Sequence, residues 1–379
     1  MPAPKSKDTK DTKKEQMTKT NRRKGAKPQT KNSKGPVSNT NEGQKPEELL
    51  EQLGKNKNRL PMYEILRAPT THSCDGFLRN LENNPRFRVP MNEKRRWKVA
   101  HDQEYLPGQF ANMENSEFIF MQAPTKSVMK VFWQGVQHDK CKVMVSLTTD
   151  NEMSATDESK CYQYFPTEVN QSIDIEQEKG KLTLLCKSRE GLSMGAIKYE
   201  MELTDSEKVI DKNSDDPNEA NMPRGLQFTL FHMNTWTGVR PESGHPLEQA
   251  QNVALFLREV NKAEMVVLRK TLENYVPPVV LQSFNAIGRA SIAWAVLMLM
   301  KDVEKRECFD FLDLMRKLMK LRPGSFSCYY HFAFAMATAL WVAKEVKWCE
   351  KDVNEALNDL MTKFPDRKLN EVGNVLPPN

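Results

Sequence analysis

The chain has 379 residues, 39% of them hydrophobic, with a net charge of +6 and seven cysteines. A transmembrane helix needs about 20 consecutive apolar residues, and the apolar stretch between Ala290 and Met300 is about half that length, so a membrane-spanning protein is excluded. The cysteines form no Cys-x-x-Cys pair and the N-terminus lacks an apolar signal segment, which excludes a secreted disulfide scaffold and predicts a cytoplasmic protein with reduced thiols.

The positive charge is concentrated at the N-terminus. Residues 1–45 contain 13 Lys and Arg against four Asp and Glu, which gives this segment +9 and leaves the rest of the chain at −3. The segment has no aromatic residue, so it cannot bury enough apolar surface to offset its ordering entropy, and we expect a disordered tail. Such a tail can attract nucleic acid, an anionic membrane or an acidic protein, and it leaves a nuclear location open. A solvated extension without a partner is the alternative.

Residues 46–366 are predicted to form one domain, followed by a C-terminal tail over residues 367–379. Pro46 opens a short helical pattern that has acidic residues in its first turn. The one break inside the domain is residues 211–224, whose Asn, Asp and Pro content is typical of an exposed loop. Because no second linker follows, the sequence offers no reason to divide the domain.

The spacing of apolar residues predicts a sheet followed by a helical C-terminal third. In residues 197–203 apolar and polar side chains alternate, which is typical of a strand with one buried face. After Pro246 the apolar residues follow a helical stripe instead. The fold class is therefore α/β or α+β, with a mixed sheet flanked by helices. The other predicted elements are strands at residues 142–147, 181–187, 226–233 and 279–281, and helices near residues 289–302, 308–320, 328–345 and 350–363.

An anion site is expected where the strand that begins at Val279 runs through a turn into a helix. Such a turn places backbone N–H groups and a helix N-terminus around one point. The turn ends in Ile287-Gly288-Arg289, which resembles the end of the signature loop of the protein tyrosine phosphatases, Val-His-Cys-Ser-x-Gly-x-Gly-Arg. In that family the Arg holds phosphate with its planar fork. The resemblance implies a remnant of a phosphate-binding site at Ser283, Phe284, Asn285, Ala286, Ile287, Gly288 and Arg289.

Other segments resemble the same family, in the same order along the chain. The match covers residues 47–365 and implies the family's fold, a central twisted mixed sheet flanked by helices. Residues 89–96 are similar to the nematode members of the family. The matching segments are Phe118 to Pro124, Val131 to Trp133, Val143 to Thr148, Lys160 to Pro166 and Leu321 to Gly324.

The resemblance also implies where the catalytic groups should lie, and two of them are missing. The family's nucleophile is a cysteine held as a thiolate six residues before the Arg, but this position is Ser283, whose hydroxyl is a much weaker acid. The family's general acid is an Asp in a mobile loop that begins with Trp. Trp236 is present, whereas the acid position is either Gly238 or deleted. Glu242 is an alternative acid, although it matches a Glu of the family that points elsewhere.

Further positions of the family's site are also changed. The two Gln that position the hydrolytic water fall on Ser327 and His331, and the Tyr that stacks on phosphotyrosine is absent from residues 84–87. Phe87 is a candidate for stacking on an aromatic ring. The six His show no metal-ligand spacing with Cys or acidic residues, so neither a metal site nor a cofactor is predicted.

These substitutions predict a catalytically inactive member, a pseudophosphatase, that acts as a protein-binding or regulatory module. Loss of the nucleophile alone can cost on the order of 10⁶ in rate. The implied partner is a protein such as a kinase or a tyrosine-phosphorylated protein, and Arg289 either retains weak phosphotyrosine binding or is kept as a structural residue. The alternatives are a residual phosphotyrosine hydrolase and a binder of nucleic acid, membrane or acidic protein through the basic tail.

Overall fold

The structure, a computed structural model, describes most of the chain between residues 91 and 362. All described residues belong to the compact unit Glu42–Asn379. The predictions for the basic tail before Lys45, the loop before Arg224, the C-terminal tail, Phe87, Glu242 and Ser327 lie outside them. The described ranges are 91–99, 105–112, 116–206, 224–238, 246–270, 275–305, 310–349 and 354–362, with short gaps at 155, 158–159, 178–179 and 327, together with Lys45, Glu47, Glu48 and Arg79.

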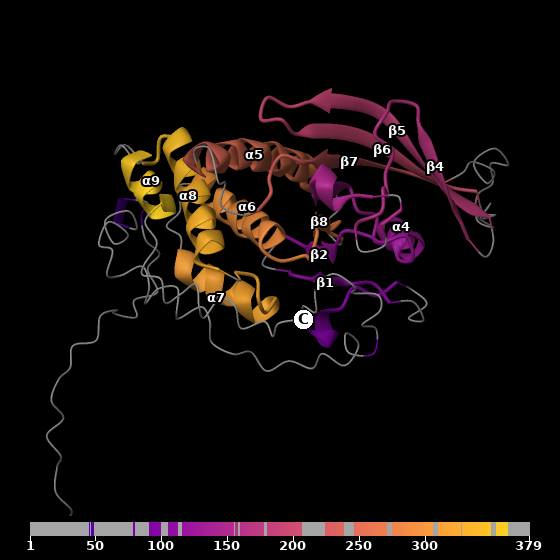
Figure 1. The fold of residues 1–379 in the computed structure, drawn as a ribbon, viewed down its shortest axis with the longest axis horizontal. Helices are drawn as coiled ribbons and strands as arrows, with labels where there is room; N and C mark the ends of the chain where they lie inside the picture. The colour runs from indigo at the N-terminus through magenta and orange to yellow at the C-terminus, as the bar shows by residue number, and fades with distance from the viewer. Residues whose placement is uncertain are drawn as a thin grey trace, which may run out of the picture. The chain divides into compact units, whose positions relative to one another are not determined.

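An eight-stranded mixed sheet forms the centre of this unit, with the strand order β1-β2-β8-β3-β7-β6-β5-β4 (Figure 1). The four strands β2, β8, β3 and β7 are parallel, and the strands at both ends of the sheet pair antiparallel. β8 therefore lies between two parallel neighbours, and the loop at its carboxyl end lies where such sheets usually place a ligand site. The strands are β1 (Gly108–Phe110), β2 (Phe118–Gln122), β3 (Val143–Leu147), β4 (Ser172–Glu176), β5 (Lys181–Gly191), β6 (Ile197–Asp205), β7 (Arg224–His232) and β8 (Val279–Ser283).

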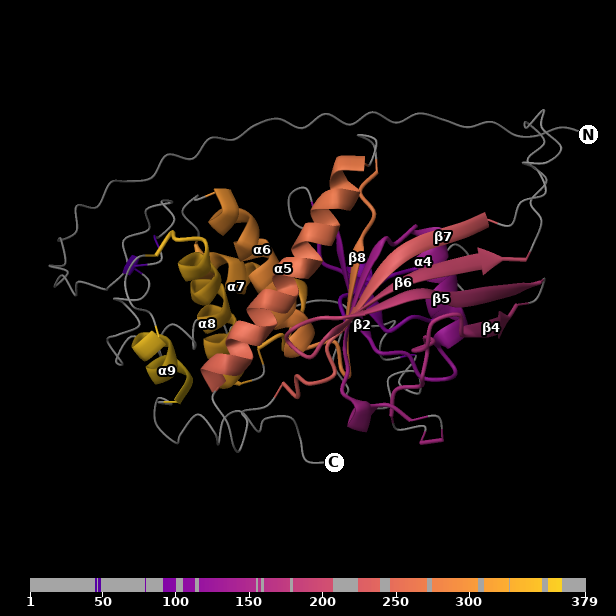
Figure 2. The same cartoon turned by 90° about the horizontal axis from the view of Figure 1, so that it is seen from above.

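Helices cover both faces of the sheet. The helices α5 to α9 pack on one face, and α4 packs on the other (Figures 1 and 2). Two 3₁₀ turns lie in the connections, η3 (Glu93–Arg95) and η4 (Asp150–Glu152). No helix in the described part of the chain is long and apolar enough to cross a membrane. The helices are α4 (Met129–His138), α5 (Pro246–Lys270), α6 (Arg289–Lys305), α7 (Phe311–Leu321), α8 (Tyr329–Glu345) and α9 (Asn354–Thr362).

The central strands are apolar on both faces because both faces are covered. In β8, Val279 and Leu281 pack into the cluster beneath the helices α5 to α9, whereas Val280 packs into the cluster beneath α4. β2 and β3 alternate between the two clusters in the same way. Continuous apolar runs are typical of parallel strands that are buried twice. This double burial fixes the register of β8 and with it the position of the loop that follows.

The predicted fold class is confirmed, and each predicted strand and helix in the described part of the sequence is present. β5 and β6 are longer than predicted, and the run from Tyr329 to Met336 is a buried helix. Four elements were missed as elements: the short strands β1 and β2, the exposed edge strand β4 and the helix α4. α4 was missed because Val131, Phe132 and Trp133 have weak helix propensity and Val128 gives no side-chain cap. Burial of these residues against the sheet decides the conformation instead.

Candidate functional site

The candidate site is the loop that joins β8 to α6. Ser283 ends the strand, residues 284–288 form the turn, and Arg289 opens the helix. Two residues of the turn have left-handed backbones, Ala286 with φ 57° and Gly288 with φ 60°. This conformation costs about 1–2 kcal/mol for a residue with a Cβ, so Ala286 is strained where a glycine would not be. The strain is local to the loop, where the chain reverses into α6.

Ser283, at the position predicted for the nucleophile, is fully buried. Its Oγ donates a hydrogen bond to the Ile287 carbonyl oxygen over 3.4 Å, and its carbonyl oxygen accepts from the Ala123 N–H at 3.0 Å. The hydroxyl is therefore directed back into its own loop. None of the Ser283 surface is available to a molecule in solution.

The loop's backbone N–H groups also bond within the protein. A phosphate-binding loop needs several N–H groups directed at the anion. Here three of them meet protein acceptors, and the longer two of these contacts are weak by the usual distance criterion. The contacts run from Ala286 N to Ser283 O (3.4 Å), from Ile287 N to Asn285 Oδ1 (3.3 Å) and from Gly288 N to Ser325 O (3.1 Å).

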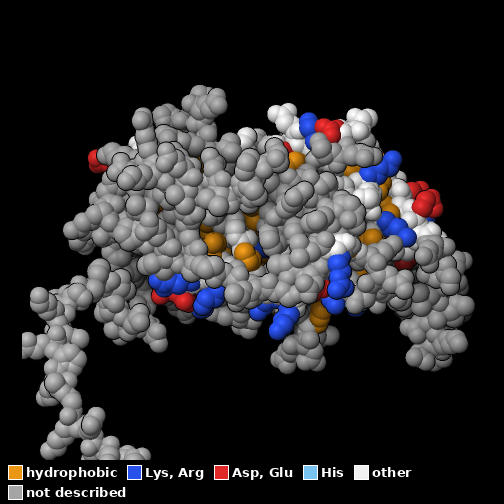
Figure 3. All heavy atoms as spheres, turned by 60° about the horizontal axis from the view of Figure 1, so that its bottom comes forward, with side chains coloured by type: hydrophobic (Ala, Val, Ile, Leu, Met, Phe, Trp, Pro, Cys, Tyr) orange, Lys and Arg blue, Asp and Glu red, His pale blue; other side chains and the backbone are white. Residues whose placement is uncertain are grey.

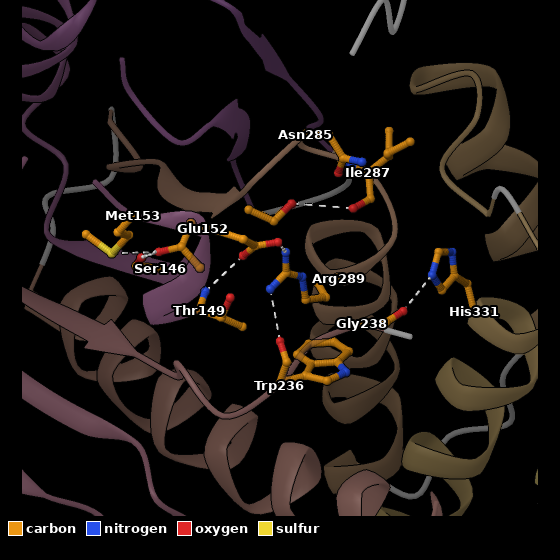
Figure 4. A network of polar contacts seen from close by, with 12 residues as sticks. Ser146, Thr149, Glu152, Met153, Trp236, Gly238, Asn285, Ile287, Arg289 and His331 are labelled. Atoms are coloured by element: carbon orange, nitrogen blue, oxygen red, sulfur yellow. Dashed lines mark hydrogen bonds and ion pairs between the residues drawn. The ribbon is translucent and has the colours of Figure 1, made fainter. Parts of the chain in front are cut away.

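The Arg289 guanidinium is enclosed at the start of α6, with 6% of the residue exposed. One nitrogen, Nη1, donates to the Trp236 carbonyl oxygen at 2.9 Å, and the other, Nη2, makes an ion pair with Glu152 Oε1 at 2.5 Å (Figure 4). These contacts connect α6 to two segments that lie far away in the sequence. The arginine predicted to hold phosphate thus has a carboxylate of this chain beside it.

Glu152 is a site residue that the sequence analysis missed. It ends the 3₁₀ turn η4, where its Oε2 accepts from the Thr149 N–H at 2.9 Å and completes a capping box. The spacing Thr149-x-x-Glu152 is the sequence signature of such a box, so the local turn was detectable. Its second role, as the partner of Arg289, was not detectable, because the two residues are 137 positions apart.

Gly238, at the position predicted for the general acid, packs directly on Arg289. A Cβ at this position would lie 2.8 Å from Arg289 Cγ, and the backbone is left-handed with φ 76°. The Gly238 carbonyl oxygen accepts a hydrogen bond from His331 Nε2 at 2.9 Å (Figure 4). The Trp236 ring is fully buried and stacks on Phe334 with centroids 5.3 Å apart. The segment 236–238 is therefore held against α6 and α8.

A second arginine supports the loop from behind. Arg322 is fully buried, and its Nε donates to the Ala286 carbonyl oxygen while its Nη1 donates to Gln109 Oε1, each over 3.4 Å. The Gln109 side chain in turn donates to the Leu321 carbonyl oxygen. In the sequence, Arg322 is only one residue of the motif from Leu321 to Gly324. Its role in connecting β1, the loop and the end of α7 follows from the structure.

Residues 80–341 match the family model described as Protein-tyrosine phosphatase. The chain belongs to this family. It is also similar to mouse Tyrosine-protein phosphatase non-receptor type 20, with 19% identity over 287 residues, which are 75% of this chain and 59% of that protein. The chain thus spans about three-fifths of the length of this curated relative. The similarity of residues 89–96 to nematode members of the phosphatase family stays a prediction.

A buried polar network lies next to the loop that joins β8 to α6 and begins at Gln282, the residue before Ser283. Gln282 is fully buried, and its Oε1 accepts a hydrogen bond from the Tyr164 hydroxyl at 2.8 Å. That hydroxyl also lies 2.9 Å from Ser146 Oγ, which contacts Thr148 Oγ1. His232 Nε2 donates to the Thr148 carbonyl oxygen at 2.9 Å, and burial lowers the pKa of His232. His232 is thus a buried histidine whose neutral ring can donate the hydrogen bond to the backbone.

The structure brings together most of the residues that the phosphatase resemblance singled out. Ser283, Arg289, Trp236, Gly238 and His331 all lie around the loop. Phe284, by contrast, packs its partly buried ring against the cluster beneath α4. Among the described residues no three His, Cys, Asp or Glu are grouped so that they could hold a metal ion. The loop is therefore surrounded by the Arg289–Glu152 ion pair, by the side chains of Ser283 and His331 and by backbone groups.

Proposed function

We propose that this chain is a catalytically inactive member of the protein-tyrosine phosphatase family, and that it acts as a protein-binding, regulatory module. The proposal includes a cytoplasmic location and a protein partner such as a kinase or a tyrosine-phosphorylated protein. The observation that carries it is Ser283. A serine hydroxyl without a base beside it is a poor nucleophile, and this hydroxyl is buried and bonded to Ile287.

The general-acid position supports the same proposal. Gly238 has no titratable group, and the space that an Asp side chain would need is filled by the Arg289 stem. Proton transfer to the leaving group contributes about 10²–10⁴ in rate to enzymes that use it. Ser283 and Gly238, which lie in two different segments, therefore both disfavour phosphotyrosine hydrolysis.

The loop's hydrogen bonds favour a structural role for Arg289 over phosphotyrosine capture. The N–H groups of Ile287 and Gly288 meet acceptors of the protein itself, and Glu152 places a negative charge beside the guanidinium. A phosphate dianion would have to displace these contacts and approach a carboxylate. We therefore infer that the partner binds elsewhere on the surface of the domain.

The test is phosphate release from phosphotyrosine peptides by the full chain, measured beside Ser283→Cys and the double variant Ser283→Cys/Gly238→Asp. We expect no release above buffer for any of the three, because the introduced thiol would stay buried and the introduced carboxylate would collide with Arg289. Turnover by the wild-type chain would refute the inactive assignment. Turnover by the double variant alone would show that the scaffold is intact and that only two side chains were lost.

Phosphotyrosine binding is measured in the same samples by calorimetry, with the unphosphorylated peptides as the control. We expect equal, weak heats for both. Phosphate-dependent binding that disappears in Arg289→Ala would reassign the chain as a phosphotyrosine trap.

Deletion of residues 1–45 separates the folded domain from the basic tail, since loss of a salt-sensitive interaction would assign binding to the tail. On the face in Figure 3, the described Lys and Arg side chains lie in separate groups, some beside Asp or Glu.

A further inference from the structure

A surface pocket lies over the ends of the strands β5, β6 and β7. Its volume is about 470 Å³, which is within the range of small-ligand sites. Three neighbouring strands line one side of it, since Arg189 of β5 pairs with Tyr199 of β6, and Ile197 of β6 pairs with His232 of β7. Residues from the segments 150–154 and 163–168 complete the lining. Among the described residues that line the pocket, none belongs to the loop that joins β8 to α6.

His232 lines this pocket with an unused hydrogen-bond acceptor. The residue is only 5% exposed, and its Nε2 donates to the Thr148 carbonyl oxygen, so in the neutral ring Nδ1 carries the lone pair. Burial lowers the pKa of His232, which favours this neutral ring. Within the described ranges of the chain, Nδ1 has no hydrogen-bond partner. Because buried polar atoms are rarely left unpaired, Nδ1 points to a ligand that donates.

Asp150 and Asn234 add two more acceptors beside His232. The Asn234 side-chain nitrogen lies 3.0 Å from both carboxylate oxygens of Asp150, which leaves the Asn234 amide oxygen as an acceptor. Asp150 is exposed and has no cationic partner among the residues that the structure describes. Further along the sheet, Arg189 and Glu168 form a loose ion pair of 3.9 Å. Two carboxylates and one guanidinium thus give the lining a net charge of −1.

We propose that this pocket binds an organic cation, an ammonium or guanidinium group on an aliphatic stem, either as a free amine or as the basic side chain of a peptide. The cationic N–H groups donate to the Asp150 carboxylate, to the Asn234 amide oxygen and to His232 Nδ1. The stem packs on the half-buried side chains of Met153 and Ile197. A cation fits because all three polar groups accept, and hydrogen bonds between charged groups are about twice as strong as neutral ones.

The test is calorimetric titration of the full chain with n-butylguanidine, with n-butylurea as its uncharged isostere. We expect n-butylguanidine to bind at least about tenfold more tightly, and to lose affinity as the salt concentration rises. A short arginine peptide and its citrulline analogue then identify the source of the cation. A preference for arginine in the peptide assigns the pocket to a basic side chain, and a preference seen only with the free compounds assigns it to a small amine. Equal affinity for both free isosteres, or no binding of either, would overturn the proposal.

Two variants with opposite expected effects locate the binding. Asp150→Asn removes the carboxylate but keeps an oxygen for the Asn234 amide, and it should weaken n-butylguanidine binding by about fivefold or more. Arg189→Gln removes a like charge from the lining and should strengthen binding by about twofold. Weaker binding in both variants would contradict the proposal, because loss of the arginine can reduce affinity only if the pocket itself is disturbed or the ligand is not a cation.

The matched control is Asp174→Asn, on the edge strand β4 and outside the pocket. It makes the same change in net charge as Asp150→Asn, and it should leave the affinity unchanged. Equal weakening by these two variants would show that n-butylguanidine responds only to the overall charge, and the pocket assignment would be wrong. Thermal melts of each variant exclude unfolding as the cause of any change.

Discussion

Two buried arginines support the same loop in different ways. The Arg289 cluster, with Glu152, Trp236 and Gly238, includes a carboxylate whose side chain is 22% exposed. Arg322 is fully buried and donates to the side chain of Gln109 and to the carbonyl oxygen of Ala286. The first cluster holds an ion pair at the edge of solvent, and the second is packed inside the protein.

This contrast bears on how a retained arginine should be interpreted. An arginine in a phosphate-binding motif is usually taken as a sign of phosphate binding. In this chain both guanidinium groups already hold carbonyl oxygens of neighbouring segments. These contacts support the proposal that Arg289 serves to hold the loop in place. Variants that affect the two clusters unequally test this explanation.

The largest effect is expected from Arg322→Ala. The substitution leaves a cavity and removes donors from the Gln109 side chain and the Ala286 carbonyl oxygen, each of which costs about 1–3 kcal/mol when left unpaired. We expect the free energy of unfolding to fall by about 4 kcal/mol in urea titrations. Arg316→Ala, on the more exposed side of the same helix α7, should change it by less than about 0.5 kcal/mol. Equal changes in the free energy of unfolding of the two variants would show that Arg322 does not support the loop.

The next largest effect is expected from Gly238→Ala, compared with Gly324→Ala. Both glycines have left-handed backbones, with φ 76° and 79°, but only a Cβ at Gly238 meets another group, at 2.8 Å from Arg289 Cγ. Gly324→Ala should cost about 1 kcal/mol for conformation alone. Gly238→Ala should cost about 3 kcal/mol because overpacking adds to it. Similar melting temperatures of the two variants would show that segment 236–238 moves away from Arg289.

A smaller effect is expected from Glu152→Gln. The change removes the negative charge beside Arg289 while the amide oxygen can still cap the Thr149 N–H. We expect the protein to lose about 1–2 kcal/mol of stability, because Arg289 stays buried with weaker compensation. Glu259→Gln, which breaks an exposed pair with Lys262, should cost at most about 0.5 kcal/mol. If both variants behave alike, the Arg289 ion pair contributes no more than a surface pair.

The smallest effect is expected on the pH dependence of the protein's stability, through His232. Burial lowers its pKa in the folded state, so between the folded and unfolded values the unfolded chain binds more protons. Stability from this residue is thus present above about pH 6.5 and is lost as the pH falls below it, by at most about 1.4 kcal/mol per pH unit. His232→Gln, which can still donate to the Thr148 carbonyl oxygen, should show a shallower loss of melting temperature between about pH 7.5 and 5. A parallel loss in both proteins would contradict this assignment.

Much of the fold was predictable because its signals are local. The alternation in β6 and the apolar run of β8 depend on neighbours along the chain, and so do the helical stripes from α5 to α9. Elements without such a signal were missed. α4 has weak helix propensity and lacks a capping side chain, and β1 and β4 are short strands that their partners in the sheet define.

The resemblance to the family was enough to single out Ser283, Gly238 and His331 in the sequence as candidate site residues. What those positions contact could be known only from the folded chain. Arg289 meets Glu152 across 137 residues, and Arg322 meets Gln109 across 213. The physical reason is that hydrogen bonds and ion pairs form between atoms about 3 Å apart in space, and spacing along the chain carries no information on such distances.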